Sequence, residues 1–173
     1  GWEKTSTNRI ARTAGVSVGS VYQYFPNKEA LVLALAHRHA GQMMAEFART
    51  ASGLADTPLE VAIPVFVRGM FEAHRLEPEL HLALVHQLLH TGLESIDEIQ
   101  VAASALVRSY LDQHQGSLAV VDLDAAAWMC VTTVDAVVHA AVLDRRRLDD
   151  PAIERELCAM LLRYLVGSPA PTG

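Results

Sequence analysis

Apolar residues recur at helical spacing along almost the whole of this chain, and no alternating run bounded by hairpin turns interrupts them. Glycine and proline fall where such helices would begin or end. The pattern predicts an all-α protein of about eight helices, with a small head and a larger body. The expected helices cover residues 7–14, 18–24, 28–50, 59–76, 78–90, 93–115, 123–143 and 151–166.

The expected division lies within the third helix, with a head at residues 1–47 and a body at 48–173. Residues 53–58 are expected to form a linker, and the tail after residue 166 is expected to fray. Two short helices cannot bury an apolar face alone, so the head needs a further bracing helix. We expect such a helix to precede this sequence, with Trp2 near its end.

Charge is unevenly distributed along the chain. The net charge is −6, but residues 1–50 carry six basic and three acidic side chains, against eight and seventeen in the remainder. A basic head on an acidic body indicates that only the head meets an anionic partner. The 51% hydrophobic content fits a packed globular protein rather than a disordered one.

Two further features bear on location. Cys130 and Cys158 lie in apolar, helical surroundings, so we expect reduced core cysteines in a cytoplasmic protein. Residues 125–143 are almost free of charge and invite comparison with a membrane span. Because this stretch contains Asp135 and His139 and lacks an aromatic belt, a helix buried in a bundle or an interface explains it better.

The stretch "GVSVGSVYQYF", residues 15–25, permits two interpretations. Its first five residues match G-x-S-x-G, the nucleophile elbow of serine hydrolases, which would make Ser17 a nucleophile. That motif requires a strand before it, whereas "TNRIARTA" has helical spacing and solvated arginines. The alternative is a DNA-binding helix-turn-helix, in which Ser17 caps the second helix beside a phosphate. We favour the second interpretation.

The helix-turn-helix interpretation accounts for the neighbouring residues. Gly15 permits the positive φ of a sharp turn, and Val16 and Val21 are expected to fill the small core. Gly19 and Ser20 are small enough to let a helix sit deep in a major groove.

Beyond single residues, "TSTNRIARTAGVSVGSVYQYFPNKEAL" resembles the DNA-binding signature of TetR/AcrR-type transcriptional regulators. The resemblance implies a homodimeric regulator, most often a repressor, that a small molecule releases from a palindromic operator. It implies backbone contacts from Thr7, Ser17, Tyr22, Tyr24 and Lys28. It implies base-edge contacts from Val18, Gly19, Ser20 and Gln23, with Arg9 as a possible addition where many members carry an acidic residue.

The body is expected to hold an apolar or aromatic effector and to form the dimer, and it resembles the family only in helix number and length. Candidate effector contacts are Phe66, Met70, Phe71, His74, His86, His90, Tyr110, Trp128 and Thr132, although an ordinary helical core explains any one of them. Candidate dimer contacts are Asp135, Val138, His139, Val142, Leu157 and Leu161. Asp135 and His139, four residues apart, can instead contact a ligand.

His86 and His90 share a helix face, with His74 and His81 upstream, which raises the question of zinc. With no cysteine near them and no H-E-x-x-H motif, we expect hydrogen-bonded histidines, no metal and no cofactor. We also expect no enzymatic activity. The remaining alternative functions are a helical small-molecule-binding protein without DNA binding and a serine hydrolase using Ser17.

Overall fold

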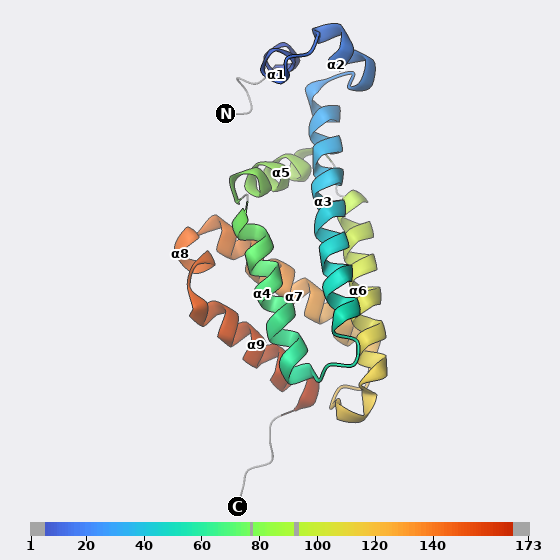
Figure 1. Ribbon diagram of the computed structural model, residues 1–173. Coiled ribbons are helices and arrows are strands. Elements are labelled where there is room, and N and C mark those ends of the chain that lie inside the picture. Colours follow the sequence, from blue (N-terminus) through green and yellow to red (C-terminus); the bar gives the residue numbers. More distant parts are fainter. Residues whose placement is uncertain (1–5, 77, 92–93, 168–173) are drawn as a thin grey trace, which may run out of the picture.

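The computed structural model describes residues 6–76, 78–91 and 94–167, without the side chains of residues 76, 85–91 and 94–98. This part of the chain is helical and contains no strand, which confirms the all-α prediction. Figure 1 shows a small head joined by one long helix to a larger bundle. The helices are α1 (Thr7–Ala14), α2 (Val18–Tyr24), α3 (Lys28–Gly53), α4 (Leu59–Leu76), α5 (Pro78–Thr91), α6 (Glu94–Gln113), the 3₁₀ helix η2 (Gln115–Ser117), α7 (Leu123–Leu143), α8 (Arg145–Leu148) and α9 (Pro151–Val166).

Side-chain caps set the helix boundaries of the head. Ser6 accepts a hydrogen bond from the backbone N–H of Arg9, and Ser17 accepts one from Ser20. Asn27 accepts one from the backbone N–H of Ala30 and so begins α3. Gly15 ends α1 with φ 69°, a left-handed conformation that glycine adopts without strain. Short polar side chains therefore satisfy the amides that a helix N-terminus leaves unpaired.

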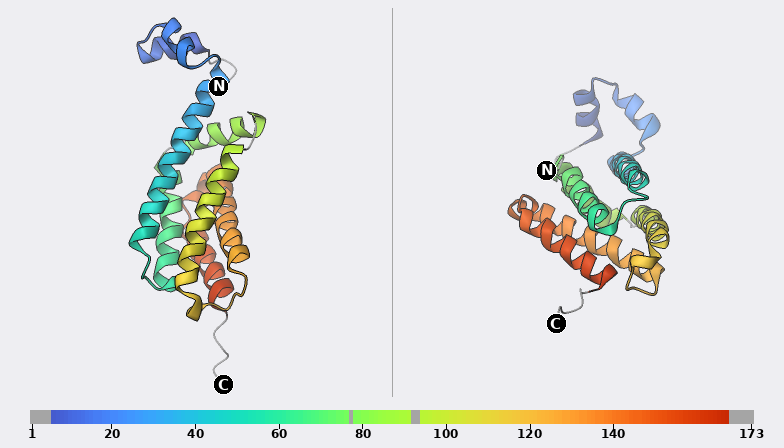
Figure 2. Two further views of the ribbon diagram at one scale, coloured as in Figure 1. Left: turned by 90° about the vertical axis from the view of Figure 1, so that its right-hand side faces the viewer. Right: turned by 60° about the horizontal axis from the view of Figure 1, so that its bottom comes forward.

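Helix α3 passes from the head into the body without interruption. In the view of Figure 2, left, it runs beside α6 and carries α1 and α2 at its upper end. It is longer than predicted, ending at Gly53 rather than near residue 50. The predicted domain boundary at residues 47 and 48 falls inside this one continuous helix.

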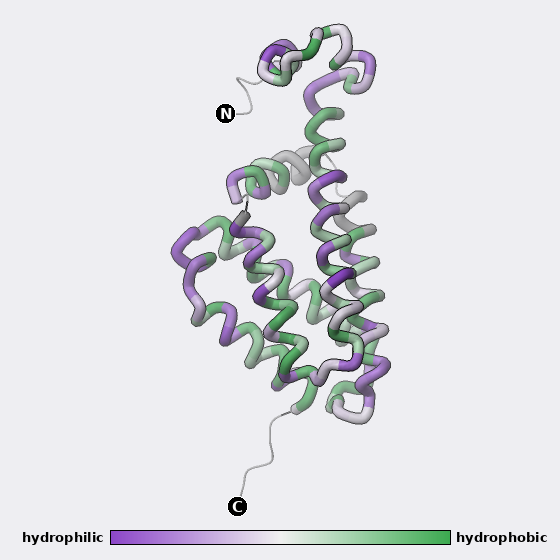
Figure 3. Tube along the Cα trace, viewed as in Figure 1, coloured by the Kyte–Doolittle hydropathy of each residue, from purple (hydrophilic) through white to green (hydrophobic). Residues whose placement is uncertain are grey.

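The core of the body lies among α4, α6, α7, α8 and α9. Its most deeply buried apolar side chains include Val67, Phe71, Leu111, Val138 and Leu148. In Figure 3 the tube is purple over parts of the head and at α8, whereas green stretches follow the inner turns of the body. Burial of these aliphatic and aromatic groups is the main force holding the bundle together.

A polar contact fastens the bundle at one corner. The Arg75 guanidinium at the end of α4 donates to the backbone carbonyl of Leu148 at 2.6 Å and pairs with Glu154 at 2.6 Å. This links α4 to the end of α8 and to the first turn of α9. Helix α8 and η2 were not predicted, because turns this short carry no apolar periodicity.

Candidate functional site

The two short helices of the head are joined by packing and by one hydrogen bond. Ala11 and Val21 are buried between them, whereas Val16, expected in this core, is exposed. The Thr7 hydroxyl donates to the Tyr22 hydroxyl oxygen at 2.8 Å. Because Thr7 is buried, its side chain supports Tyr22 from α1 rather than facing solvent.

The outer side of α2 is open to a partner. Val18, Gly19, Ser20, Tyr22 and Gln23 are all exposed. A Cβ built on Gly19 would meet only the Ser17 Oγ at 3.8 Å, an ordinary contact. No neighbour within the described chain therefore requires a glycine here, so its small size is available for close approach to a partner.

Polar groups flank this surface on both sides. Tyr24 is 79% exposed at the end of α2, and Arg9 is exposed on α1. Lys28 begins α3 and lies 4.0 Å from the Glu29 carboxylate. A cation at a helix N-terminus opposes the helix dipole, and an anionic partner would offset that repulsion.

The geometry around Ser17 does not match a hydrolase elbow. A helix, not a strand, leads into Gly15. The Ser17 hydroxyl oxygen lies 2.7 Å from the Ser20 hydroxyl and accepts the Ser20 amide as a helix cap. The side chain therefore serves the local structure of α2.

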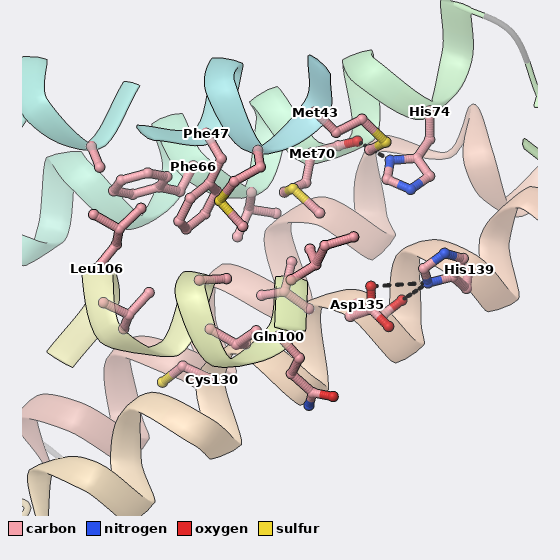
Figure 4. Close-up of a pocket in the computed structure, with 18 of the residues that line it drawn as sticks. Met43, Phe47, Phe66, Met70, His74, Gln100, Leu106, Cys130, Asp135 and His139 are labelled. Carbon is pink, nitrogen blue, oxygen red and sulfur yellow. Dashed lines mark hydrogen bonds and ion pairs between the residues drawn. The ribbon is translucent and has the colours of Figure 1, made fainter. Parts of the chain in front are cut away.

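The body contains an apolar cavity of about 270 Å³ that is partly open to solvent. Figure 4 shows Phe47, Phe66 and Leu106 toward one end, and Met43 and Met70 beside them. The Phe47 and Phe66 rings lie 5.3 Å apart, between centroids. Aliphatic, aromatic and methionine side chains from α3, α4 and α6 thus form most of the wall, as in many small-molecule sites.

The other end of the cavity is polar. His74 from α4 and His139 from α7 lie there together with Asp135, as Figure 4 shows. The Asp135 carboxylate accepts a hydrogen bond from His139 Nδ1 at 3.1 Å. The cavity therefore has a long apolar part and a compact polar end.

Burial sets the charge of these histidines. It lowers the pKa of His74 to about 4, and it lowers that of His81, together with the neighbouring His74 and His139, to about 3. Burial also disfavours the charged form of His139, but the hydrogen bond and charge of Asp135 outweigh it and raise the pKa. His74 and His81 are thus neutral at neutral pH.

Two family descriptions match the sequence of this chain. "Bacterial regulatory proteins, tetR family" matches residues 1–35, and "Tetracyclin repressor-like, C-terminal domain" matches residues 58–165. The second match alone covers more than half of the chain. The chain belongs to the TetR family. It is a DNA-binding transcriptional regulator with a helix-turn-helix head and a ligand-binding body, as predicted.

Relatives agree with the TetR assignment. The chain is 23% identical over 172 residues to the fatty acid metabolism regulator protein of Bacillus subtilis (strain 168), covering 94% of this chain and 86% of the relative. The structure of the regulator FadR from Bacillus subtilis in complex with stearoyl-CoA matches with a TM-score of 0.72 at 23% identity, covering 95% and 90% of the two chains.

A third match has a different biological role. SmeT, the repressor of the Stenotrophomonas maltophilia multidrug efflux pump SmeDEF, has a TM-score of 0.69 at 24% identity, covering 99% and 86% of the chains. TetR-family regulators are soluble DNA-binding proteins. At these identities the structural matches establish the fold alone.

The predicted effector contacts divide into three groups in this TetR-family structure. Phe66, Met70, His74 and Tyr110 line the cavity. Phe71 is fully buried in the core, Thr132 accepts a hydrogen bond from Gln100, and Trp128 is 55% exposed, and none of the three lines the cavity. The side chains of His86 and His90 lie outside the described residues.

The predicted dimer contacts fall mostly inside one chain. Val138, Val142, Leu157 and Leu161 are buried in the monomer core. Asp135 and His139 line the cavity and hydrogen-bond to each other. Their position is that expected of ligand contacts, the alternative to a dimer contact. For the four apolar residues, spacing predicts that the side chains lie on a buried helix face. It does not show whether the same chain or a second copy buries that face.

Sequence reasoning also missed cavity residues on α3. Ala36, His39, Met43 and Phe47 line the cavity from the helix that begins in the head. Their spacing of three and four residues places them on one helix face, and this could have indicated a shared wall. The assignment of residues 1–47 to the head concealed it.

Proposed function

We propose that this TetR-family regulator is a homodimeric repressor without catalytic activity, released from a palindromic operator by an amphipathic, fatty-acyl-type molecule. The observation that carries this proposal is the cavity, which is apolar over most of its length and polar at one end. An apolar wall selects for hydrocarbon, and a few convergent polar groups orient the ligand.

The polar end suggests the chemistry of the head group. His139 carries a raised pKa beside Asp135, and His74 and His81 are neutral. When His139 is protonated, its Nε2–H can donate to a carbonyl or carboxylate oxygen. A fatty acid or fatty-acyl thioester offers such an oxygen at the end of a hydrocarbon chain. The fatty acid regulator among the relatives and the stearoyl-CoA bound by FadR support this class of ligand.

For the operator, we propose a division of labour within the head. Val18, Gly19, Ser20 and Gln23 on α2 read base edges in the major groove, with Arg9 nearby. Ser17, Tyr22, Tyr24 and Lys28 hold phosphates, and Thr7 fixes Tyr22 through their hydrogen bond. The exposure of all of these except Thr7 and the half-buried Lys28 supports the division.

The dimer interface is proposed on the outer face of α7 and α9. Trp128 and Met129 are 55% and 44% exposed on α7, and Met160 and Tyr164 are 45% and 37% exposed on α9. The Tyr164 hydroxyl lies 3.5 Å from Met129 Sδ, so the two helices present one apolar surface. Only 33% of the most apolar stretch of α7 is buried within the chain, and a second copy would cover the rest.

Helix α3 is the proposed coupling element. It carries Lys28 at the DNA end and Met43 in the cavity wall, about 22 Å apart along the helix axis. A ligand that displaces the cavity face of α3 therefore moves the head. In a dimer, this changes the spacing of the two α2 helices relative to consecutive major grooves.

The binding half of the proposal is tested with stearoyl-CoA as the probe and coenzyme A as its control. Isothermal titration should detect stearoyl-CoA binding to the purified chain and much weaker binding of coenzyme A. Ala103→Phe, which places a ring in the cavity wall, should reduce stearoyl-CoA affinity by at least about tenfold. Equal binding of both probes, or no effect of Ala103→Phe, would contradict an acyl-binding cavity.

A further inference from the structure

Four helices bring four histidines together at the polar end of the cavity. His39 lies on α3, His74 on α4, His81 on α5 and His139 on α7. The ring centroids of His74 and His81 are 4.3 Å apart, and those of His81 and His139 are 4.7 Å apart. One ring nitrogen from each of His74, His81 and His139 lies within 4.8 Å of the other two. His39 and His139 are distant in the sequence from His74 and His81, so the fold assembles the cluster.

Hydrogen bonds hold two of these rings in one tautomer. His74 Nδ1 lies 2.7 Å from the Met70 carbonyl oxygen, and His139 Nδ1 lies 2.9 Å from the Asp135 carbonyl oxygen. A carbonyl oxygen can only accept, so each Nδ1 carries the proton. When such a ring is neutral, Nε2 therefore presents a lone pair. This donation from the second nitrogen to an oxygen is typical of histidines that bind metals.

The Nε2 atoms of His74 and His81 are buried without a hydrogen-bond partner in the described part of the chain. His74 is 2% exposed and His81 is 7% exposed. A buried polar atom left unpaired destabilises a protein, so such atoms usually have a bound partner.

We propose that His74, His81 and His139 bind one divalent transition-metal ion, best matched by Zn²⁺, through their Nε2 atoms. His39 orients the His81 ring. The Nε2 atom of His39 lies 3.3 Å from His81 Nδ1 and can accept the proton on that nitrogen. Each ligand then has its Nδ1 held by an acceptor: a carbonyl, a carboxylate or an imidazole. Imidazole nitrogens suit zinc and its neighbours rather than magnesium or calcium.

The distances permit this coordination after a small adjustment. Zinc–nitrogen bonds of ~2.05 Å in a tetrahedron place the nitrogens about 3.3 Å apart. One ring nitrogen from each histidine lies within 4.8 Å of the other two, so bringing three nitrogens to this spacing requires a movement of about 1.5 Å, with rotation of any ring whose Nε2 is not the nearest nitrogen. Three protein ligands leave one position open, and all three histidines line the cavity. Water or an oxygen atom of a bound effector can occupy that position.

In the sequence, His86 and His90, with His74 and His81 upstream, raise the question of zinc, and no metal is expected there. The proposed site takes His74 and His81 from that group but adds His139, more than fifty residues downstream. Because the three histidines lie on three different helices, residue spacing along one helix does not reveal this site. The proposal rests on the geometry of the histidines and not on the acyl ligand, although these histidines also line the end of the cavity assigned to its head group.

The test uses the untagged full chain, stripped of metal, and Zn²⁺ alone as the probe. Isothermal titration should detect one zinc per chain. His81→Gln and His139→Gln should each weaken binding by more than about 100-fold, and His39→Gln by about 10- to 100-fold. His114→Gln is the matched control, because His114 Nδ1 contacts the Tyr110 carbonyl in the same way but lies outside the cluster.

Circular dichroism establishes that each variant is folded before its zinc affinity is compared. A second measurement needs no variant: crystals of the wild-type chain grown with zinc should show anomalous density between His74, His81 and His139. Density elsewhere, zinc affinity retained by the His81→Gln/His139→Gln double variant, or no binding at micromolar zinc would overturn the proposal. An ordered water with no anomalous signal between the rings would do the same.

Discussion

The hydroxyl of Thr7 donates to the hydroxyl oxygen of Tyr22 at 2.8 Å, which joins the first helix of the head to the second. Tyr22 is half exposed, whereas Thr7 is 7% exposed. One side chain therefore has a structural partner within the chain and an outer surface available to DNA. Tyr24, on the same helix, is 79% exposed.

Removing the Tyr22 hydroxyl should affect both stability and DNA binding. Tyr22→Phe leaves the buried Thr7 hydroxyl without its acceptor, so we expect the head to lose about 1 kcal/mol of stability. Tyr24→Phe, the matched control, should change stability by less than ~0.5 kcal/mol. Hydrogen exchange of the α1 and α2 amides measures the difference. Equal protection in both variants would contradict the structural role of Tyr22.

Lys28 is expected to act on DNA of every sequence alike. Lys28→Ala should lower affinity for operator and non-operator DNA by a similar factor. It should also reduce the slope of log affinity against log salt concentration by the amount that about one phosphate contact contributes. Arg49→Ala, on the body end of the same helix, should leave that slope unchanged. Fluorescence anisotropy across a salt series measures both variants. An unchanged slope for Lys28→Ala would refute its role as a phosphate contact.

Gln23 is expected to read a base. Gln23→Ala should relax preference at one operator position, where discrimination between bases falls by about 1–3 kcal/mol. Preference at the other positions should persist, because Gly19 and Ser20 are unaltered. Binding to a set of single-base operator variants measures this. If all variants lose affinity equally, Gln23 does not contact a base edge.

Trp128 should lie at the centre of the dimer interface. Trp128→Glu places a charge in the apolar surface of α7 and α9 and should weaken dimerisation by at least about 2 kcal/mol. Val101→Glu on α6 is the control, since Val101 is also exposed but lies on another helix. Sedimentation equilibrium measures both. A Trp128→Glu protein that remains dimeric would place the interface elsewhere.

The head could be predicted from sequence because its geometry follows from local chemistry. Ser17 and Gly15 act on backbone groups within three or four residues of themselves, and the structure places both as expected. Val16 is the exception. It occupies a turn where helical periodicity no longer determines which side chain is buried.

The cavity could be predicted only in part, because core and cavity wall share the same residue types. Phe66 and Phe71 lie five residues apart on α4, yet one lines the cavity and the other is buried in the core. On α7, apolar residues surround the helix, so periodicity did not separate the core side of Val138 from the outer side of Trp128. The histidine cluster depends on contacts between distant helices, which spacing along the chain does not encode.

The most direct test of the account is the coupling between ligand and DNA. Operator affinity should be measured by anisotropy with and without saturating stearoyl-CoA, and stearoyl-CoA affinity with and without operator. The account predicts that stearoyl-CoA weakens operator binding, and that operator weakens stearoyl-CoA binding by the same factor, about 5- to 150-fold. Operator affinity that stays the same at saturating stearoyl-CoA would contradict it.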